Sequence, residues 1–448
     1  MANTTDSNPE RSGMKMPGGI PFIVGNEAAE RFSYYGMRAI LVIFMTQYLR
    51  NSAGELDVMT DAESRGWYHA FSSAVYFFPL LGAILSDGFL GKYRTVFFLS
   101  LVYCLGHLAL AIDDTRLGLG VGLGLIALGS GGIKPCVAAN LGDQFNEKNQ
   151  PLLSRAYGWF YFAVNGGAFV STIVTPLILA RSGPNWAFAL PGILMFIATL
   201  LFWMGRKRYV HVPPGGPAFL KEVVSRDGLR AIGRLAFLYC FFAAFWSIYD
   251  QNGSTWVLQA THMDRNLFGR EWLPSQIQVL NPILVMIYVP LFSYVVYPAI
   301  DKFVTMTANR KIGLGFFLTV PCVLVIAWVE QRIQAGESPS IAWHVLAFMI
   351  LIAAEVLVYQ TGLELSYTQA PNSMKSLIMA LFNLSISLGN LFTSGVNFFI
   401  QNADGSTKLG PVSYHLFFAG LMFVVATAFI FASRFFQGQT YLQSSPQE

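Results

Sequence analysis

Twelve apolar segments, each long enough to cross a membrane as a helix, recur along the 448 residues of this chain. The hydrocarbon core of a bilayer is about 30 Å thick, and a helix needs about 20 apolar residues to span it. Because no water is available there, backbone hydrogen bonds must close within each segment, which favours helices. We therefore predict an all-α, polytopic membrane protein. The predicted helices lie near residues 20–49, 66–87, 93–113, 117–142, 153–180, 187–205, 233–258, 276–299, 312–332, 341–368, 374–401 and 411–436.

The composition points to the same class of protein and excludes others. Of all residues 54% are hydrophobic and 12% are charged, whereas soluble domains carry about 25% charged residues. No basic cluster interleaves with aromatic residues, so we expect no nucleic-acid partner. The 4 cysteines and 6 histidines show no ligand spacing, so we expect no disulfide, no metal site and no cofactor. Residues 1–19 are polar, so we expect no cleavable signal peptide.

Basic residues are distributed unequally between the two sides that twelve spans define. Of the 29 lysines and arginines, eighteen fall on the side of the termini, eight on the other side, and three within the membrane. Because cytoplasmic loops carry the excess of positive charge, we expect both termini in the cytoplasm. We expect the chain to be a multi-pass protein of the plasma (inner) membrane.

The longest polar break divides the chain into two six-helix halves. It contains the run Pro213-Pro214-Gly215-Gly216-Pro217 and several basic residues. Such a layout suits a transporter in which two bundles rock about a central site. Within the break, residues 217–234 could form an amphipathic helix on the membrane surface. The predicted parts are a tail (1–19), a bundle (20–205), a loop (206–232), a second bundle (233–436) and a tail (437–448).

The first apolar segment carries an unusual stripe of charge. As a helix, it stacks Glu27, Arg31, Tyr34 and Arg38 on one face, with Glu30 beside them. An ionisable group at bilayer depth costs about 2.5–3.5 kcal/mol on insertion scales. These groups are therefore expected to face a polar interior and to pair with one another.

This stripe resembles a known family motif. The pattern Glu27-x-x-Glu30-Arg31-Phe32-x-Tyr34-Tyr35-Gly36 is similar to the first-helix motif of the proton-dependent oligopeptide transporter (POT/PTR) family, within the major facilitator superfamily. Four further runs resemble motifs of that family. They are Gly131-Gly132-Ile133-Lys134-Pro135, Phe160-Tyr161-x-x-x-Asn165-x-Gly167, Phe245-Trp246-x-x-x-Asp250-Gln251 and Gly362-Leu363-Glu364-x-Ser366-Tyr367-x-Gln369-Ala370-Pro371.

The resemblance implies a fold and a function. The fold would be the major facilitator fold, with 12 transmembrane helices in two six-helix bundles. The function would be proton-coupled symport of di- and tripeptides into the cell by alternating access. The alternative is a carrier of the same family for another small solute, such as nitrate or a modified amino acid. One chain would contain the whole pathway, so we expect a functional monomer.

A peptide is a zwitterion, so its site needs a cationic pole, an anionic pole and an adaptable wall between them. We assign the cationic pole to Arg31, Arg38 and Lys134, which are the intramembrane cations of the first half. Glu364 would provide the anionic pole. Polar and aromatic side chains would line the rest of the predicted substrate site, namely Tyr34, Tyr35, Tyr76, Asn165 and Asn281. Glu355, half a helical turn from Glu364 at ideal pitch, is left unassigned.

Proton coupling needs buried acids that can exchange a salt bridge for a proton. Glu27 and Glu30 beside Arg31 fit this requirement, and Glu364 is a further candidate. The resemblance implies a Lys134–Asp250 ion pair between the halves, which protonation or substrate entry would break.

Two residues of the second predicted helix region allow two interpretations each. His69 is either a satisfied structural histidine or a group that titrates in the transport cycle. Asp87, in a run from Gly82 to Arg94 that resembles a loop motif of the major facilitators, is either a gating latch or a capped turn. The predicted gating residues are thus Asp87, Lys134 and Asp250.

The sequence disfavours other classes of protein. No Gly-x-Ser-x-Gly, His-Glu-x-x-His or Walker pattern occurs, so we expect neither an enzyme nor an ATP-driven pump. A scaffold would gain nothing from charges inside several helices.

Overall fold

The structure is a computed structural model, and it describes residues 15–146, 149–214, 216, 226–368 and 375–434. The first half contains α1 (Ile20–Gln47), α2 (Asp61–Leu85), α3 (Lys92–Ile112), α4 (Arg116–Gly142) and α5 (Leu153–Met204). The second half contains α7 (Arg226–Tyr249), α8 (Thr255–Ala260), α9 (Leu280–Leu291), α10 (Tyr297–Asp301), α11 (Ala308–Gln334), α12 (Ala342–Glu355), α13 (Thr361–Thr368), α14 (Lys375–Ile400) and α15 (Pro411–Ala432). A two-residue hairpin, β1 (Asn266–Leu267) with β2 (Arg270–Glu271), follows α8.

Three π-helical turns and several 3-10 turns interrupt or join these helices. The π turns are Ser86–Leu90, Phe292–Val296 and Val356–Gln360. The 3-10 turns are Gln150–Leu152, Gly205–Lys207, Asp250–Gly253 and Pro274–Val279. Because π turns often lie at functional sites, the turn that follows Glu355 is of particular interest.

The twelve predicted spans can all be located in the described residues. Length and composition alone identify 10 helices able to cross a membrane. One of these stretches, 150–207, contains two spans, because Gly183 with φ 82° breaks the helical path inside α5. The twelfth span is α1, whose charged side chains exclude it from a composition-based count.

Some boundaries differ from the prediction. The helix α2 begins five residues earlier than expected, at Asp61, because the Thr60 hydroxyl accepts a hydrogen bond from the Glu63 amide (3.2 Å) and caps the first turn. The helix α7 begins at Arg226 rather than 233, so the end of the predicted loop is helical. Residues 217–225 of the expected amphipathic helix lie outside the described residues, and the remainder belongs to α7.

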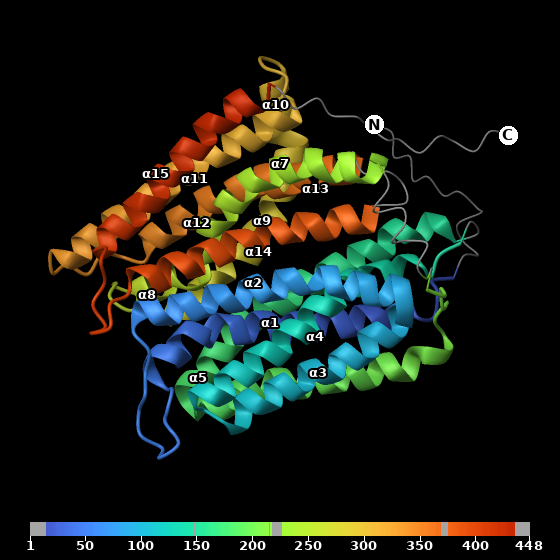
Figure 1. The fold of residues 1–448 in the computed structure, drawn as a ribbon, viewed down its shortest axis with the longest axis horizontal. Coiled ribbons are helices and arrows are strands. Elements are labelled where there is room, and N and C mark those ends of the chain that lie inside the picture. The colour runs from blue at the N-terminus through green and yellow to red at the C-terminus, as the bar shows by residue number, and fades with distance from the viewer. Residues whose placement is uncertain (1–14, 147–148, 215, 217–225, 369–374, 435–448) are drawn as a thin grey trace.

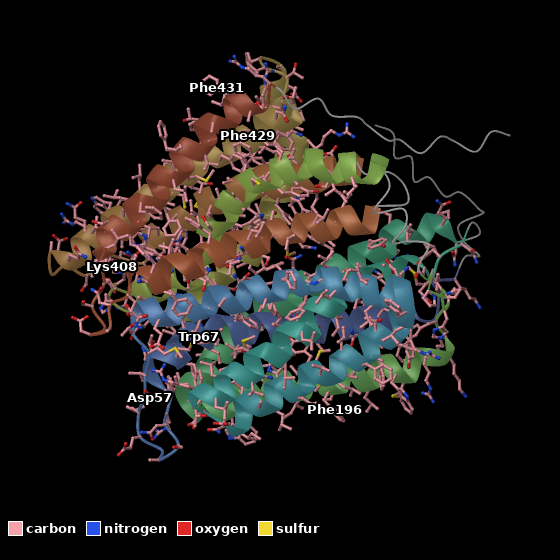
Figure 2. The ribbon with its side chains drawn as sticks, in the orientation of Figure 1. Asp57, Trp67, Phe196, Lys408, Phe429 and Phe431 are labelled. Carbon is pink, nitrogen blue, oxygen red and sulfur yellow. The ribbon has the colours of Figure 1, made fainter. Side chains whose placement is uncertain are left out.

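The two halves lie side by side, with α1–α5 on one side and α7–α15 on the other (Figure 1). Each half has its own core, with Phe44, Tyr103 and Phe188 in the first and Phe242 and Phe316 in the second. Large apolar side chains also cover the outside of the bundles. In Figure 2, Phe196 and Phe431 project outward, and they are 57% and 58% exposed. Such a surface suits lipid contact.

The boundary between the halves is formed largely by α2 and α14, which run next to each other (Figure 1). Serine and asparagine side chains pair along it. The Ser73 and Ser387 hydroxyls lie 3.0 Å apart, and the Arg65 guanidinium donates to the Asn397 amide oxygen at 3.0 Å. We call this row of paired polar side chains the α2–α14 seam.

The pairing between the halves is confined to one end of the molecule. Within the described residues, every hydrogen bond that joins the halves involves the C-terminal part of α1, the N-terminal part of α2 or the middle of α5. That end carries the loop between α1 and α2. The two halves are therefore joined at this end, which we call the outer end. At the opposite end, which we call the inner end, no hydrogen bond joins the halves within the described residues.

Candidate functional site

The charged stripe of α1 forms a compact buried cluster. Arg31 Nε lies 2.6 Å from a carboxylate oxygen of Glu27 and 3.1 Å from one of Glu30. The Ser130 hydroxyl of α4 donates to the other oxygen of Glu30 at 2.8 Å. Both acids are 1% exposed. Two carboxylates therefore share one guanidinium in a site shielded from water.

Arg38, two turns further along α1, reaches across to the second half. Its Nη2 donates to Asp250, which begins the 3-10 turn after α7, and its Nε donates to the Tyr68 hydroxyl at 2.6 Å. The Asp250 side chain is 2% exposed. Charge-assisted hydrogen bonds of this kind are stronger than neutral ones, so the pair fastens the two halves together.

The Asp250 carboxylate is also the start of a chain of hydrogen bonds to His69. The Asn390 amide nitrogen donates to Asp250 at 2.6 Å, which turns its amide oxygen toward His69 Nδ1 at 2.7 Å. His69 Nδ1 must therefore carry the proton that it donates. Its Nε2 lies 2.9 Å from the Ser254 hydroxyl. His69 is thus fully paired within the closed outer end, and its titration in the cycle stays a prediction.

The structure corrects the expected ion pair between Lys134 and Asp250. Asp250 pairs with Arg38, and Lys134 has no carboxylate within 4 Å among the described residues. Instead, its ammonium lies over the rings of Tyr34 and Tyr76, 4.2 and 4.5 Å from their centroids. The reason is that Asp250 is already paired with Arg38, while the Lys134 ammonium is held between two tyrosine rings.

A cavity of about 330 Å³ lies between the halves, bordered by these networks. Five of the nine predicted substrate residues line it, namely Tyr35, Arg38, Tyr76, Asn165 and Asn281. Two of them are held by neighbours, since the Asn281 amide donates to the Tyr249 hydroxyl at 2.6 Å and the Asn165 amide donates to the Tyr161 carbonyl at 2.9 Å. Arg31, Tyr34 and Lys134 are not among the lining residues.

Besides Asp250, the acid that lines the cavity is Glu355, whereas Glu364 was the predicted one. Glu355 ends α12 and lines the cavity, and its Oε2 is buried without a hydrogen-bond partner in the described residues. Glu364 is exposed and does not line the cavity. The sequence analysis predicted that Glu355 and Glu364 lie on opposite faces of one helix, but it assigned the cavity-facing side to Glu364. The π turn at Val356–Gln360 also interrupts the ideal pitch on which that choice relied.

Among the described residues, the hydrogen bond of Asp87 is a local one. Its carboxylate accepts a hydrogen bond from the Ser86 hydroxyl at 2.9 Å, within the π turn that follows α2. The ion pair in this region joins Lys92 and Asp143 at 2.6 Å, both in the first half. A turn is therefore what the structure shows, and the gating role of Asp87 stays a prediction.

Comparison with known proteins places this arrangement in a family. Residues 93–227 and 218–415 match the family model described as the POT family. The chain belongs to the POT family. This result confirms the family that the sequence motifs indicate, together with the predicted membrane fold.

Similar proteins include solute carriers of family 15 and proteins named as peptide transporters. The human solute carrier family 15 member 2 is 38% identical over 410 residues, which cover 80% of this POT-family chain and 55% of that protein. Peptide transporter family 1 of Drosophila melanogaster is 35% identical over 365 residues, covering 71% and 48%. The chain therefore spans about half the length of these relatives.

Solved structures of the family match nearly the whole chain. The POT family transporter PepTSo is 34% identical, with a TM-score of 0.85 and coverage of 94% of this chain and 99% of that one. Another proton-dependent oligopeptide (POT) family transporter is 35% identical, with a TM-score of 0.78 and coverage of 92% and 100%.

Sequence reasoning missed several residues that line the cavity in this POT-family chain. Besides Glu355, they include the aromatic residues Tyr161, Trp246, Tyr249 and Tyr359. Tyr161 and Trp246 belong to two of the family motifs, so the motifs could have identified them as candidate site residues. Glu355 offered a signal as well, because it is one of two acids in the predicted span 341–368, and an acid at bilayer depth is a functional candidate by default.

Proposed function

We propose that this chain carries di- and tripeptides across the membrane together with protons. The observation that carries the proposal is the pairing of opposite charges in one cavity. Arg38 comes from the first half and Glu355 from the second, and aromatic side chains lie between them. A zwitterionic peptide would direct its carboxylate toward Arg38 and its ammonium toward Glu355. The unpartnered Oε2 of Glu355 supports this, since buried acceptors normally have a donor.

The size of the cavity supports short peptides. Small-molecule sites have volumes of about 300–1,000 Å³, and this cavity of about 330 Å³ stands at the lower limit. A peptide would have to reach Arg38 and Glu355 at the same time. Peptides that are too short or too long would therefore bind poorly. Tyrosine and tryptophan walls can accept side chains of varied shape.

The cluster on α1 is our candidate for proton coupling. Glu27 and Glu30 carry two negative charges, and among the described residues Arg31 is the one cation that forms an ion pair with either of them. Burying an uncompensated charge is costly, so this cluster is suited to take up one proton. Protonation of one acid would weaken its ion pair with Arg31. The Arg31 guanidinium could then join Arg38 in binding the substrate carboxylate. Protons would be the coupling ion, with no cofactor.

The closed outer end supports transport by alternating access. We propose that the inner end faces the cytoplasm, as the excess of basic residues on that side suggests, and that the chain lies in the plasma (inner) membrane. Uptake would then run from the outer end inward, with the Arg38–Asp250 pair and the α2–α14 seam opening and closing in each cycle. A single chain contains both halves and could work as a monomer.

The deciding experiment is uptake by purified protein in liposomes. An imposed inward proton gradient should drive accumulation of labelled alanyl-alanine, and protein-free liposomes should show none. Unlabelled trialanine should compete, whereas tetra-alanine should compete poorly. If accumulation were the same with and without the gradient, proton coupling would be refuted.

The alternative substrates are tested in the same assay. Nitrate would place an anion in a cavity that Glu355 makes partly negative, so the geometry favours a zwitterion. A modified amino acid fits the two poles less easily than a dipeptide does, because its charged groups lie closer together. Competition by nitrate or by a free amino acid at least as strong as that by trialanine would favour this alternative.

A further inference from the structure

A second cleft lies in the first half, at the inner end of α3 and α4. Its volume is about 480 Å³, and it shares no lining residue with the central cavity. Lys92 and Arg94 come from the start of α3, Asn140 and Asp143 from the end of α4, and His211 from the segment that leads toward the second half. Transport as proposed above makes no use of this cleft.

The hydrogen bonds beneath the cleft leave one donor without an acceptor. The backbone amide of Val210 donates to Gln144 Oε1 at 2.9 Å, which fixes the orientation of that side-chain amide. Gln144 Nε2 therefore donates, at 3.3 Å to Asn140 Oδ1. The amide nitrogen of Asn140, Nδ2, is therefore not used in this hydrogen bond. It is buried and has no hydrogen-bond partner in the described residues, and Asn140 is only 2% exposed. An unsatisfied buried donor indicates a missing acceptor.

The charges around this donor favour an anionic acceptor. Lys92 is held 2.6 Å from Asp143, which balances its charge, while Arg94 is exposed and adds a second cation. His211 Nε2 lies 3.0 Å from the carbonyl oxygen of Arg206, so this nitrogen carries a proton. The lining thus combines an excess of donors with a net positive charge. Phosphate oxygens are acceptors that suit such a set.

The surroundings of the cleft place it at the level of the lipid headgroups. Phe89 and Val212, both lining residues, are 67% and 47% exposed. Close by in the chain, the Arg206 guanidinium lies 3.7 Å from the Trp203 ring centroid. Tryptophan with arginine at a helix end is typical of the membrane–water interface. An occupant with both a phosphate and an apolar part therefore fits better than a soluble anion.

We propose that this cleft binds the phosphate of an anionic phospholipid from the inner leaflet. The phosphate accepts hydrogen bonds from the Asn140 amide and from Arg94, and the acyl chains lie against Phe89 and the neighbouring helix surface. Because Val210 and His211 begin the connection between the halves, the bound lipid also holds this connection against the first half. All contacts lie within one half, so binding is independent of which end of the transporter is open.

Lipid retention by the full-length protein tests this proposal. The protein is purified in detergent, titrated with phosphatidylglycerol, phosphatidylcholine or inorganic phosphate, and weighed by native mass spectrometry. The variants are Asn140→Asp, which replaces the free donor by a carboxylate of the same shape, and Arg94→Gln, at an exposed position. Lys302→Gln, which removes an exposed basic residue from the second half, is the control.

We expect one tightly held phosphatidylglycerol per chain and weaker retention of phosphatidylcholine. Losing one hydrogen bond to a charged group weakens binding by about tenfold or more, so both variants should lose affinity by that factor while the control retains it. Equal retention by both variants and the control would overturn the site. Inorganic phosphate that binds as tightly as the lipid would overturn the assignment to a lipid. Failure of peptide uptake in liposomes would leave this result unaffected, because the assay measures only lipid binding.

Discussion

Arg38 on α1 donates a hydrogen bond to Asp250 of the second half, and both side chains are buried where the outer end closes. This contact joins the charged stripe of the first helix to the network of Asn390 and His69. It also borders the central cavity, since both residues line it. Closure of the outer end and the charge presented to a substrate are therefore controlled by the same two side chains.

Replacing Asp250 with asparagine should weaken the closed outer end. The Arg38 guanidinium would keep its charge but lose its counter-ion, and breaking a buried pair typically costs about 3–5 kcal/mol. Spin labels at Ala53 and Ala403, both exposed at the outer end, should report a shift toward longer distances. The matched control is Glu271→Gln, because Glu271 also pairs with an arginine but is 64% exposed. An unchanged distance distribution in Asp250→Asn would contradict the role of the pair.

Replacing Glu355 with glutamine should weaken peptide binding, and Glu364→Gln should not. Glu355 lines the cavity with an unpartnered oxygen, whereas Glu364 lies outside the lining. Loss of one charged hydrogen bond of about 1.5–3 kcal/mol should raise the half-saturating concentration of alanyl-alanine by about tenfold or more. N-acetylated alanyl-alanine lacks the ammonium, so the Glu355→Gln variant should discriminate against it less than the unaltered protein does. The reverse ranking of the two variants would restore the original assignment to Glu364.

Glutamine at Glu27 or Glu30 should uncouple uptake from the proton gradient. Either change leaves one carboxylate for Arg31 and removes the excess negative charge that would attract a proton. Gradient-driven accumulation should fall, while exchange of labelled for unlabelled peptide without a gradient should continue. Ser130→Ala is a milder test, because it removes only the hydrogen bond to Glu30. Accumulation that keeps its full dependence on the gradient in both glutamine variants would exclude this cluster as the coupling site.

Alanine at Gly82 should destabilise the first half. A Cβ at this position would overlap the backbone of Gly132, because α2 approaches α4 closely there. Overpacking costs about 1–3 kcal/mol, so the melting temperature in detergent should fall. Gly124→Ala on α4 is the control, since a Cβ there meets nothing within 4 Å, and alanine favours a helix over glycine. Equal melting temperatures would contradict the close approach.

The sequence was sufficient for the fold and for the chemistry of the site, but not for its pairing. Long apolar segments and the stripe on α1 predict where the helices and the buried charges lie, because charge in lipid must face inward. Which partner each charge finds depends on depth and rotation, and these come from packing. Lys134 and Asp250 show this, because Asp250 pairs with Arg38 and Lys134 lies over two tyrosine rings. Glu355 and Glu364 show the effect of rotation, because a helical wheel gives relative faces without identifying the inner one.

The α2–α14 seam has a consequence for how often the outer end can open. Its members are mostly hydroxyls and amides such as those of Ser73, Ser387 and Asn397, and each such hydrogen bond contributes only about 0.5–1.5 kcal/mol net, because water can replace the partner. An apolar interface at the same place would resist opening, because its side chains would be exposed to water. The polar seam can instead separate and re-form repeatedly, because water hydrates both of its sides at only a small cost per hydrogen bond.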